Sequence, residues 1–373
     1  MVRVAVLGAG CIGQWVGGHL ALRGVDVLLV GKGLLERTVK SGSLRLTDVE
    51  RDAAGFDESL QLPDHPHLTA KFDLEEALKS DDFLAVFVCL KLGDNDLAAS
   101  LGTLKKDTVI ISMQNGIDNK KKLAKLLPEH PIVGGMVPYG VIEAAPGHLR
   151  RATFGPLVFD DGMPAPLTAA LRGAGLAVEV LSEADTHAEQ CFKLVVNCQN
   201  ALNALRGCPL VEAAQDRLYR ELMASAWEEA TEVLRRSGQP LRGTINGMPM
   251  DRYLRILRLP NFALNAVKRL KSGLAPDPGY HSSMFYDLEQ RRRTEIEELN
   301  GLVVKMAAAV GVPCPVNTAL ARLVREAEEK NVGSPRLSPE ALLREVRKEA
   351  PVPGAAPKRT SPFARFCPQR CAM

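Results

Sequence analysis

The sequence predicts an α/β protein in which a doubly wound, mostly parallel sheet is followed by an all-helical C-terminal domain. Up to about residue 182, short apolar runs alternate with helical stretches, the pattern of a parallel sheet covered by helices. From about residue 183 onward, strand signals disappear and long helical patterns take over. We therefore expect a sheet domain at residues 1–182, a helical domain at residues 183–333, and a Pro/Arg-rich C-terminal extension at residues 334–373.

The first thirty residues predict a dinucleotide site. An apolar, β-branched run at residues 2–7 leads directly into the motif Gly8-Ala9-Gly10-Cys11-Ile12-Gly13, which a helical stretch and a second apolar strand follow. In this context Gly8 permits the tight turn, Gly10 lets the backbone approach a pyrophosphate, and Gly13 lets helix and strand pack closely. The pyrophosphate would bind the free N–H groups at the helix N-terminus. These features predict a Rossmann-type domain.

The end of the second strand bears on which dinucleotide binds. Sites specific for NAD usually place an acidic residue there, whereas a cation accommodates the 2′-phosphate of NADP. Here the strand ends in Val30-Gly31-Lys32, and the nearest acidic residue, Asp26, lies near the start of the strand. We therefore expect NADP as the cofactor, with Lys32 as a ligand; an ordinary surface lysine is the alternative.

The next stretches continue the alternation of strands and helices. Continuous apolar runs at residues 83–90 and 108–113 predict central parallel strands, and they end next to Lys91 and Asn115. Because ligands of such sheets bind outside the carboxyl ends of the strands, both residues are candidates for the site. The other elements expected here are helices at 34–40, 74–79, 97–104 and 120–127, short strands within 41–62, and strands at 132–137, 148–158 and 176–181.

One helix of the C-terminal half combines buried and polar character. The helices expected in this half cover residues 187–205, 211–237, 250–257, 282–310 and 318–330. On the first of them, Lys193, Asn197 and Asn200 fall on one narrow stripe at about 100° per residue. Polar groups on a buried helix must find partners or cost several kcal/mol. A structural hydrogen-bond network is the alternative to an active-site role.

The end of the chain differs in composition from the rest. Beyond Gly333 it is rich in Pro, Arg and Ala, with one candidate helix at residues 339–349. We expect this extension to be largely disordered because it lacks core-forming periodicity. Truncation after Gly333 is therefore expected to leave a folded, active protein.

Composition argues against several classes of protein. The net charge of +3 becomes −1 when the four basic residues of segment 351–373 are set aside, so it does not indicate a nucleic-acid partner. No run of about eighteen apolar residues predicts a membrane span. The eight cysteines are scattered and lack zinc-site spacing, so we expect reduced thiols and no metal site. The first predicted strand begins at residue 2, which favours a cytoplasmic location. The sequence is compatible with a homo-oligomer but does not predict an oligomeric state.

Taken together, these stretches resemble the 2-dehydropantoate 2-reductase (ketopantoate reductase) family over residues 1 to about 330. The resemblance rests on the glycine turn, Lys32, Leu90-Lys91, Gln114-Asn115-Gly116, Lys193 with Asn197, Ser282-Ser283-Met284, Thr294-Glu295-Ile296, Leu299-Asn300-Gly301 and Gly311 through Asn317-Thr318. It implies that Lys193 is the proton donor and that Glu295 lies in the active site. It also implies that Asn115, Asn197 and Ser283 contact substrate or cofactor.

The chain departs from the family pattern in three places. The second helix asparagine of the family often lies where this chain has Ala201, and Asn200 stands one residue earlier. The segment between Cys208 and Ser283 is longer than in compact bacterial members, and the C-terminal extension is additional. These departures affect the prediction of the substrate more than the prediction of the reaction type.

The expected activity is the NADPH-dependent reduction of a branched 2-oxo acid, with ketopantoate first. Hydride transfer places negative charge on the carbonyl oxygen, and Lys193 would donate a proton to it, typically for a factor of about 10²–10⁴. Glu295 would orient Lys193 and accept a hydrogen bond from the product hydroxyl. The substrate would be held by Asn115, Asn197, Asn200 and Ser283. The alternatives are a reductase of another 2-oxo acid and a non-catalytic NADP(H)-binding regulatory protein.

Overall fold

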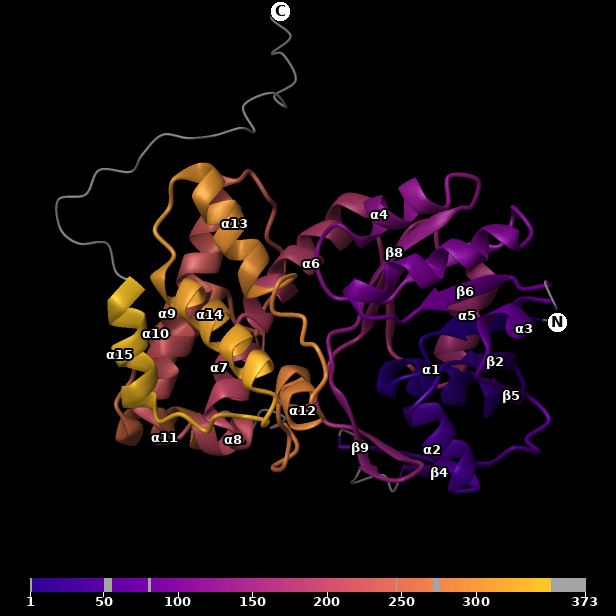
Figure 1. Ribbon diagram of the computed structural model, residues 1–373, viewed down its shortest axis with the longest axis horizontal. Helices are drawn as coiled ribbons and strands as arrows, with labels where there is room; N and C mark the ends of the chain where they lie inside the picture. Colours follow the sequence, from indigo (N-terminus) through magenta and orange to yellow (C-terminus); the bar gives the residue numbers. More distant parts are fainter. Residues whose placement is uncertain (1, 50–55, 80–81, 246, 271–275, 350–373) are drawn as a thin grey trace, which may run out of the picture.

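The computed structural model describes residues 2–49, 56–79, 82–245, 247–270 and 276–349. The chain forms an α/β half and a helical half that lie side by side, as Figure 1 shows. Strand β12 (Val178–Leu181) ends the α/β half, and helix α6 (Glu183–Asn197) leads from it into the helical half. The predicted fold class is confirmed, and we propose that the two halves are the two domains.

The main sheet of the described residues has eight strands in the order β12-β11-β8-β7-β6-β1-β2-β5. Neighbouring strands run parallel except β8 and β11, which are antiparallel. From β5 to β8 the order is that of a dinucleotide-binding sheet, and it reverses between β1 and β6, where ligands bind. The strands before β12 are β1 (Arg3–Leu7), β2 (Asp26–Val30), β5 (Leu68–Lys71), β6 (Ala85–Val88), β7 (Val109–Ser112), β8 (Ile132–Met136) and β11 (Leu157–Asp160).

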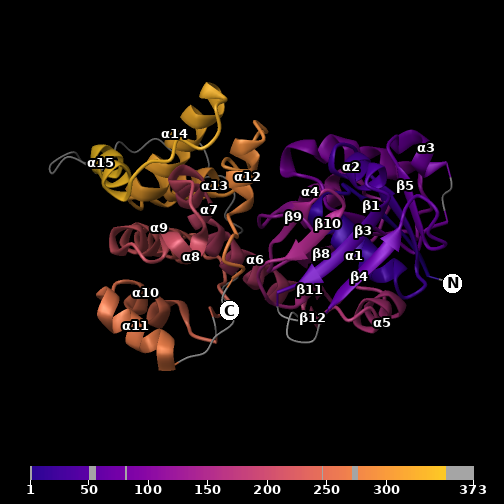
Figure 2. The same ribbon diagram turned by 90° about the horizontal axis from the view of Figure 1, so that it is seen from below.

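A second, four-stranded sheet has the order β4-β3-β10-β9. Helix α1 (Cys11–Ala21) packs against both sheets through two glycines. An added Cβ would lie 2.7 Å from Leu29 of β2 at Gly17 and 3.0 Å from Leu46 of β3 at Gly18. The strands of the second sheet are β3 (Ser43–Asp48), β4 (Asp57–Gln61), β9 (Val141–Ala145) and β10 (His148–Arg151). Figure 2 shows α1 beside this sheet.

Two expectations for the α/β half need correction. The single strand expected at residues 148–158 is two strands, β10 and β11, in different sheets, because Gly155 and Pro156 interrupt the run. The α-helix expected at residues 97–104 is a 3₁₀ helix, η2 (Leu92–Thr103), in a stretch with two glycines and other weak helix formers. The other helices of this half are α2 (Leu34–Lys40), α3 (Leu74–Leu78), α4 (Asn119–Leu126) and α5 (Ala165–Gly173).

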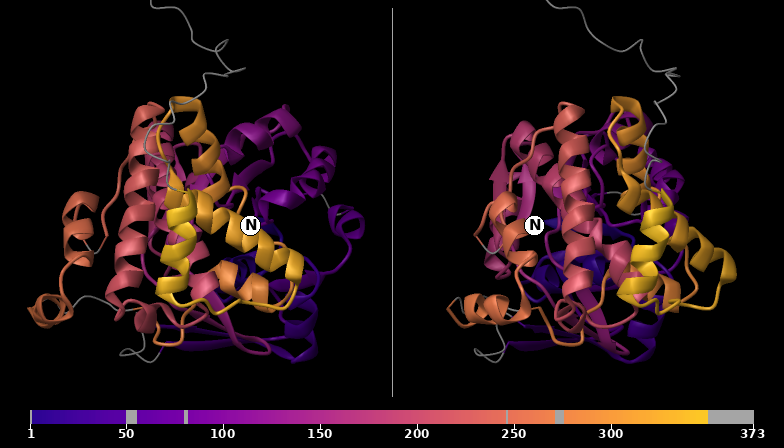
Figure 3. Two further views of the ribbon diagram at one scale, coloured as in Figure 1. Left: turned by 60° about the vertical axis from the view of Figure 1, so that its left-hand side comes forward. Right: turned by 90° about the vertical axis from the view of Figure 1, so that its left-hand side faces the viewer.

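The helical half is built around helix α9 (Arg217–Arg236), which packs against α6, α7, α10, α13, α14 and α15. Its buried Tyr219 and Trp227 belong to the core of this half. Helices α10 and α11 stand at one side of the half, as Figure 3 shows. The other helices are α7 (Gln199–Arg206), α8 (Leu210–Ala213), α10 (Met250–Leu257), α11 (Asn261–Leu270), α12 (Ser283–Glu289), α13 (Asn300–Val310), α14 (Pro315–Lys330) and α15 (Pro339–Glu349).

The prediction of one continuous helix at residues 282–310 is wrong, because a loop interrupts it in the middle. Helix α12 ends at Glu289 and α13 begins at Asn300, so residues 290–299 form a loop that carries Glu295. Arg291 has a φ of 54°, which an α-helix does not allow. Thr294 also bonds locally, because its Oγ1 accepts a hydrogen bond from the Ile296 N–H at 3.2 Å.

The boundary expected at residue 333 is also wrong. Helix α15 packs on α14 and α9, and its Leu342 is fully buried. Arg322 of α14 donates hydrogen bonds to Glu345 at 3.0 Å and to Glu349 at 2.8 Å. An apolar face of α15 therefore extends the helical core to residue 349, and truncation after Gly333 would expose that core. The expected disorder of residues 350–373 lies outside the described residues. No helix in the described parts is long and apolar enough to cross a membrane.

Candidate active site

A large cavity of about 1550 Å³ lies between the two halves. Its walls include the loops after β1, β6 and β7, helices α6, α7, α9, α10 and α12, and the loop at residues 290–299. Ordinary small-molecule pockets measure about 300–1,000 Å³. The cavity therefore has room for a dinucleotide together with a second small molecule.

The glycine turn has the geometry that the motif predicts. Gly8 has a φ of 95°, and a Cβ added to it would lie 2.7 Å from the carbonyl carbon of Cys89. A Cβ added to Gly13 would lie 2.5 Å from the Gly8 oxygen and 2.8 Å from Val6, so only glycine lets α1 approach β1 this closely. Gly10 has open space where a Cβ would stand and begins α1 without a side-chain cap. An uncapped helix N-terminus in the cavity wall fits a pyrophosphate.

The basic residues after β2 differ in their exposure to the cavity. Lys32 is exposed and is not part of the described cavity lining, although Leu34 two residues later is. Arg37 of α2 lines the cavity, and its guanidinium donates hydrogen bonds to Glu143 at 2.7 and 3.2 Å. Two cations therefore follow β2: Lys32, which is exposed, and Arg37, which is paired with a carboxylate.

Lys91 lines the cavity and links the two halves. Its Nζ lies 2.5 Å from Oδ1 of Asp287 on α12 and donates to the carbonyl oxygen of Arg293 at 3.2 Å. Asp287 is buried and also accepts from Arg292 at 3.0 Å. The lysine that was expected to bind cofactor thus also holds the helical half against the sheet.

Asn115, three residues after the end of β7, is the centre of the polar end of the cavity. Its Oδ1 accepts a hydrogen bond from Lys193 Nζ at 2.8 Å, and its Nδ2 donates one to Glu295 Oε2 at 2.7 Å. The Asn115 amide therefore connects Lys193 and Glu295, the two residues that were expected to be catalytic. Glu295 was expected to orient Lys193, and in the structure Asn115 bonds to both side chains.

The surroundings shift the proton affinity of both ionisable groups. Burial lowers the pKa of Lys193 from 10.5 to about 8, against the opposing effect of the negative charge on Glu295. Burial raises the pKa of Glu295, while the hydrogen bond from Asn115 and the charges of Lys91 and Lys193 oppose that rise. A lysine with a pKa near 8 can release a proton close to neutral pH.

The polar stripe expected on the helix lines the same cavity. Lys193 and Asn197 lie on α6 and Asn200 on α7, and a break at Cys198 separates the two helices. Asn197 Nδ2 is 3.5 Å from Asn115 Oδ1. Ser283 also lines the cavity, at the start of α12.

The neighbouring residues Ser282 and Asn203 hold this arrangement together. Ser282 caps α12, and its hydroxyl donates to the Asn200 carbonyl oxygen at 3.0 Å. Asn203, fully buried, accepts from the Ser282 N–H at 2.8 Å and donates to the Cys208 carbonyl oxygen at 2.9 Å. These contacts fix Ser283 beside the stripe.

Some cavity residues were missed by sequence reasoning. Arg292 and Asp287 lie in a charged run that, taken alone, predicts a solvated face. Phe192 and Val196, beside Lys193 and Asn197, carried the signal of an ordinary core helix.

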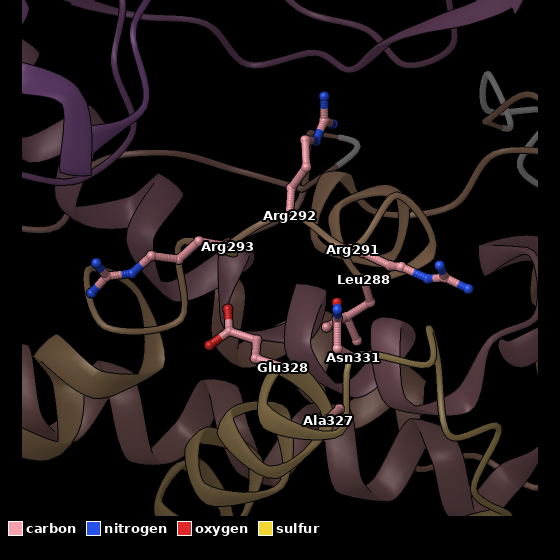
Figure 4. A pocket seen from close by; sticks show the side chains of 7 residues that line it. All are labelled: Leu288, Arg291, Arg292, Arg293, Ala327, Glu328 and Asn331. Atoms are coloured by element: carbon pink, nitrogen blue, oxygen red, sulfur yellow. The ribbon is translucent and has the colours of Figure 1, made fainter.

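A smaller hollow of about 240 Å³ lies behind the loop that carries Arg292. It is lined by Leu288, Arg291, Arg292, Arg293, Ala327, Glu328 and Asn331. In Figure 4 the Arg292 side chain points away from Glu328 and Asn331, and Arg292 also lines the large cavity. The small hollow falls below the usual size of a ligand pocket. Within the described residues no group of His, Cys, Asp and Glu side chains could hold a metal ion.

The chain matches two sequence models of one family. Residues 4–163 match the model described as "Ketopantoate reductase PanE/ApbA", and residues 185–328 match the one described as "Ketopantoate reductase PanE/ApbA C terminal". A similar curated protein is a 2-dehydropantoate 2-reductase of Archaeoglobus fulgidus. It is 26% identical over 333 residues, which cover 87% of this chain and 98% of the relative.

Solved structures with the same arrangement include a PanE/ApbA family ketopantoate reductase from Ralstonia eutropha JMP134. It has a TM-score of 0.70 and 29% identity, and the match covers 88% of this chain and 99% of that one. A D-mandelate dehydrogenase with NADH and anilino(oxo)acetate has a TM-score of 0.68, 19% identity and the same two coverages. At 19% identity this second similarity concerns the fold alone.

Proposed function

The chain belongs to the ketopantoate reductase PanE/ApbA family and is an oxidoreductase, and we propose that it reduces ketopantoate with NADPH, with Lys193 as the proton donor. The single observation that carries the proposal is the Lys193–Asn115–Glu295 connection, which lies in the cavity that the glycine turn also lines. Relatives named 2-dehydropantoate 2-reductase support ketopantoate as the substrate.

Lys193 suits the role of general acid because of its pKa. At neutral pH a group with a pKa of about 8 is mostly protonated, yet it gives up its proton far more readily than an exposed lysine. Its ammonium already donates to one acceptor, Asn115 Oδ1, so its other N–H groups remain to meet a substrate oxygen. A proton from Nζ would neutralise the oxygen of the 2-oxo group as that group becomes a hydroxyl.

The amide and hydroxyl groups along the cavity suit a 2-oxo acid. Asn197, Asn200 and Ser283 offer hydrogen-bond donors to the carboxylate and carbonyl oxygens of the substrate. Asn115 keeps Lys193 in place through its Oδ1. Glu295 is free to accept a hydrogen bond from the product hydroxyl through the oxygen that does not bind Asn115.

The glycine turn and the cations after β2 support NADP as the cofactor. When bound, the reduced nicotinamide supplies the hydride. The turn from Gly8 to Gly13, with Ala9, Cys11 and Ile12 between the glycines, offers backbone N–H groups to the pyrophosphate. Lys32 is proposed to contact the 2′-phosphate, and Arg37 is a second candidate because it lines the cavity.

The proposal is tested by NADPH oxidation with ketopantoate and a panel of other 2-oxo acids. Lys193→Ala should lower kcat by about 10²–10⁴ while the Kd for NADPH stays close to that of the unmodified protein. His187→Ala is the matched control, since His187 lies on the same helix but bonds to Gln239 at 2.8 Å and is not in the described cavity lining. Near-normal turnover of Lys193→Ala, or a larger loss in His187→Ala, would mean that the proton comes from another group.

A further inference from the structure

The cavity lining includes five apolar residues of the helical half, which we call the apolar lobe: Phe192, Val196, Trp227, Ile245 and Tyr253. We propose that this lobe binds the side chain of the substrate, and that the site therefore also reduces 2-oxo acids with large apolar or aromatic side chains. The inference rests on the proposed reduction of ketopantoate and extends it to a wider class of 2-oxo acids.

The first observation is that helix α6 presents two neighbouring rows to the cavity. One row is polar and contains Lys193 and Asn197; the other is apolar and contains Phe192 and Val196. With about 100° per residue, the rows lie about 100° apart on the helix surface. A 2-oxo acid that places its oxo and carboxylate oxygens on the polar row would therefore direct its side chain toward the apolar row.

The second observation is that the walls of the lobe are preformed. Trp227 Nε1 donates to the Val196 carbonyl oxygen at 3.2 Å, which fixes the indole against α6. The rings of Trp227 and Tyr253 lie 6.0 Å apart between centroids. The Phe192 ring packs on the Gly243 backbone so closely that an added Cβ would lie 2.4 Å from it. A rigid aromatic pocket of this kind gains affinity for an apolar group without ordering its walls.

The third observation is the contrast between the lobe and the adjacent core. Leu194 and Val195 are 1% and 0% exposed, whereas Phe192, Val196, Ile245 and Tyr253 are only partly buried and face the cavity. Apolar surface left in contact with water is unfavourable, and an apolar ligand group that covers it is bound more tightly. The side chain of ketopantoate carries two methyl groups and a hydroxymethyl group, and a larger apolar or aromatic side chain would cover more of this surface.

The first experiment measures kcat/KM with NADPH for pyruvate, ketopantoate, 2-oxo-4-methylpentanoate and phenylpyruvate. Each methylene that enters an apolar pocket is worth about tenfold or more, so we expect phenylpyruvate to exceed pyruvate at least tenfold. Turnover of pyruvate and ketopantoate with a lower value for phenylpyruvate would overturn the lobe and leave the proposed function intact. Failure with every 2-oxo acid would overturn the proposed function, and the binding experiment below would then decide the lobe.

Two variants connect the preference to the lobe. Thr244→Phe adds a ring at an exposed position of the cavity lining next to Ile245, where folding is little affected, and Val196→Phe enlarges a lobe residue on α6. Both should lower the ratio of kcat/KM for phenylpyruvate to that for pyruvate at least fivefold. Leu241→Phe is the matched control, because Leu241 is 38% exposed and not in the described lining. An unchanged ratio in Thr244→Phe, or an equal change in Leu241→Phe, would contradict the assignment.

The second experiment measures binding without turnover. The protein saturated with NADPH is titrated with phenyllactate and with lactate in a calorimeter, and no reaction occurs because both partners are reduced. The Kd of phenyllactate should be at least tenfold lower than that of lactate, and Thr244→Phe should reduce this difference. Equal dissociation constants would overturn the proposal, whatever the turnover data show.

Discussion

Replacing Glu295 by glutamine should move the pH dependence of turnover to lower pH. The substitution removes one negative charge but keeps the shape of the side chain and an oxygen that accepts from Asn115. Two hydrogen bonds through one amide place the Lys193 and Glu295 charges on the order of 7 Å apart. At an effective dielectric constant of about 20, their attraction is about 2 kcal/mol, which corresponds to a lysine pKa lowered by roughly 1.5.

The sign of the effect follows from the protonation state that is required. Lys193 must be protonated to donate, so kcat should be high below its pKa and fall as the pH rises through about 8. Without the Glu295 carboxylate the ammonium is less stabilised, and the fall should begin at a pH roughly 1.5 lower. Near neutral pH this lowers the protonated fraction of Lys193 severalfold, and turnover should recover in more acidic buffer.

The assay is kcat for NADPH oxidation across the pH range, at saturating substrate, for both proteins. Glu297→Gln provides the control, because it makes the same chemical change two residues later in the same loop. Glu297 instead pairs with Arg325 at 2.5 Å and with Lys305 at 3.5 Å, and it is not in the described cavity lining. A Glu295→Gln profile with an unmoved alkaline limb would refute the coupling of Glu295 to the proton donor.

Three further substitutions test other parts of the molecule. Lys32→Ala should weaken NADPH binding by about 1.5–3 kcal/mol and leave NADH binding nearly unchanged. Titration of Arg37→Ala in parallel shows which of the two cations binds the 2′-phosphate. Equal losses of affinity for NADPH and NADH in Lys32→Ala would exclude Lys32 from that role. Gly13→Ala should lower the Tm and abolish the stabilisation by NADPH, because the added Cβ would clash with the backbone. Gly10→Ala should keep the Tm, because the space around Gly10 is open. Similar Tm values for the two variants would contradict this expectation. Leu342→Ala should cost about 2–5 kcal/mol of unfolding free energy in urea, and a cost near zero would show that α15 is not part of the core.

Features that depend on neighbouring residues in the chain were predictable from the sequence alone. The glycine turn, the helix after it and the central parallel strands follow from spacing and apolar periodicity, and the structure has them. The placement of Lys193, Asn197 and Asn200 along one stripe follows from the helical repeat, and all three line the cavity. These relations are set by local geometry, which a single stretch of sequence carries.

Other features were decided only by the tertiary structure. Asn115 lies between Lys193 and Glu295, although 78 and 180 residues separate it from them in the chain. The helix expected through Glu295 is a loop, because contacts such as the Thr294 N–H to Glu328 at 2.6 Å outweigh the helical preference of the segment. The charged run around Asp287 and Arg292 predicts a solvated helix face. Its sequence gives no sign that the α/β half packs against it. The lowered pKa of Lys193 therefore arises from the packing of segments that are distant in the chain, because burial and the proximity of charges depend on the three-dimensional structure and not on sequence order.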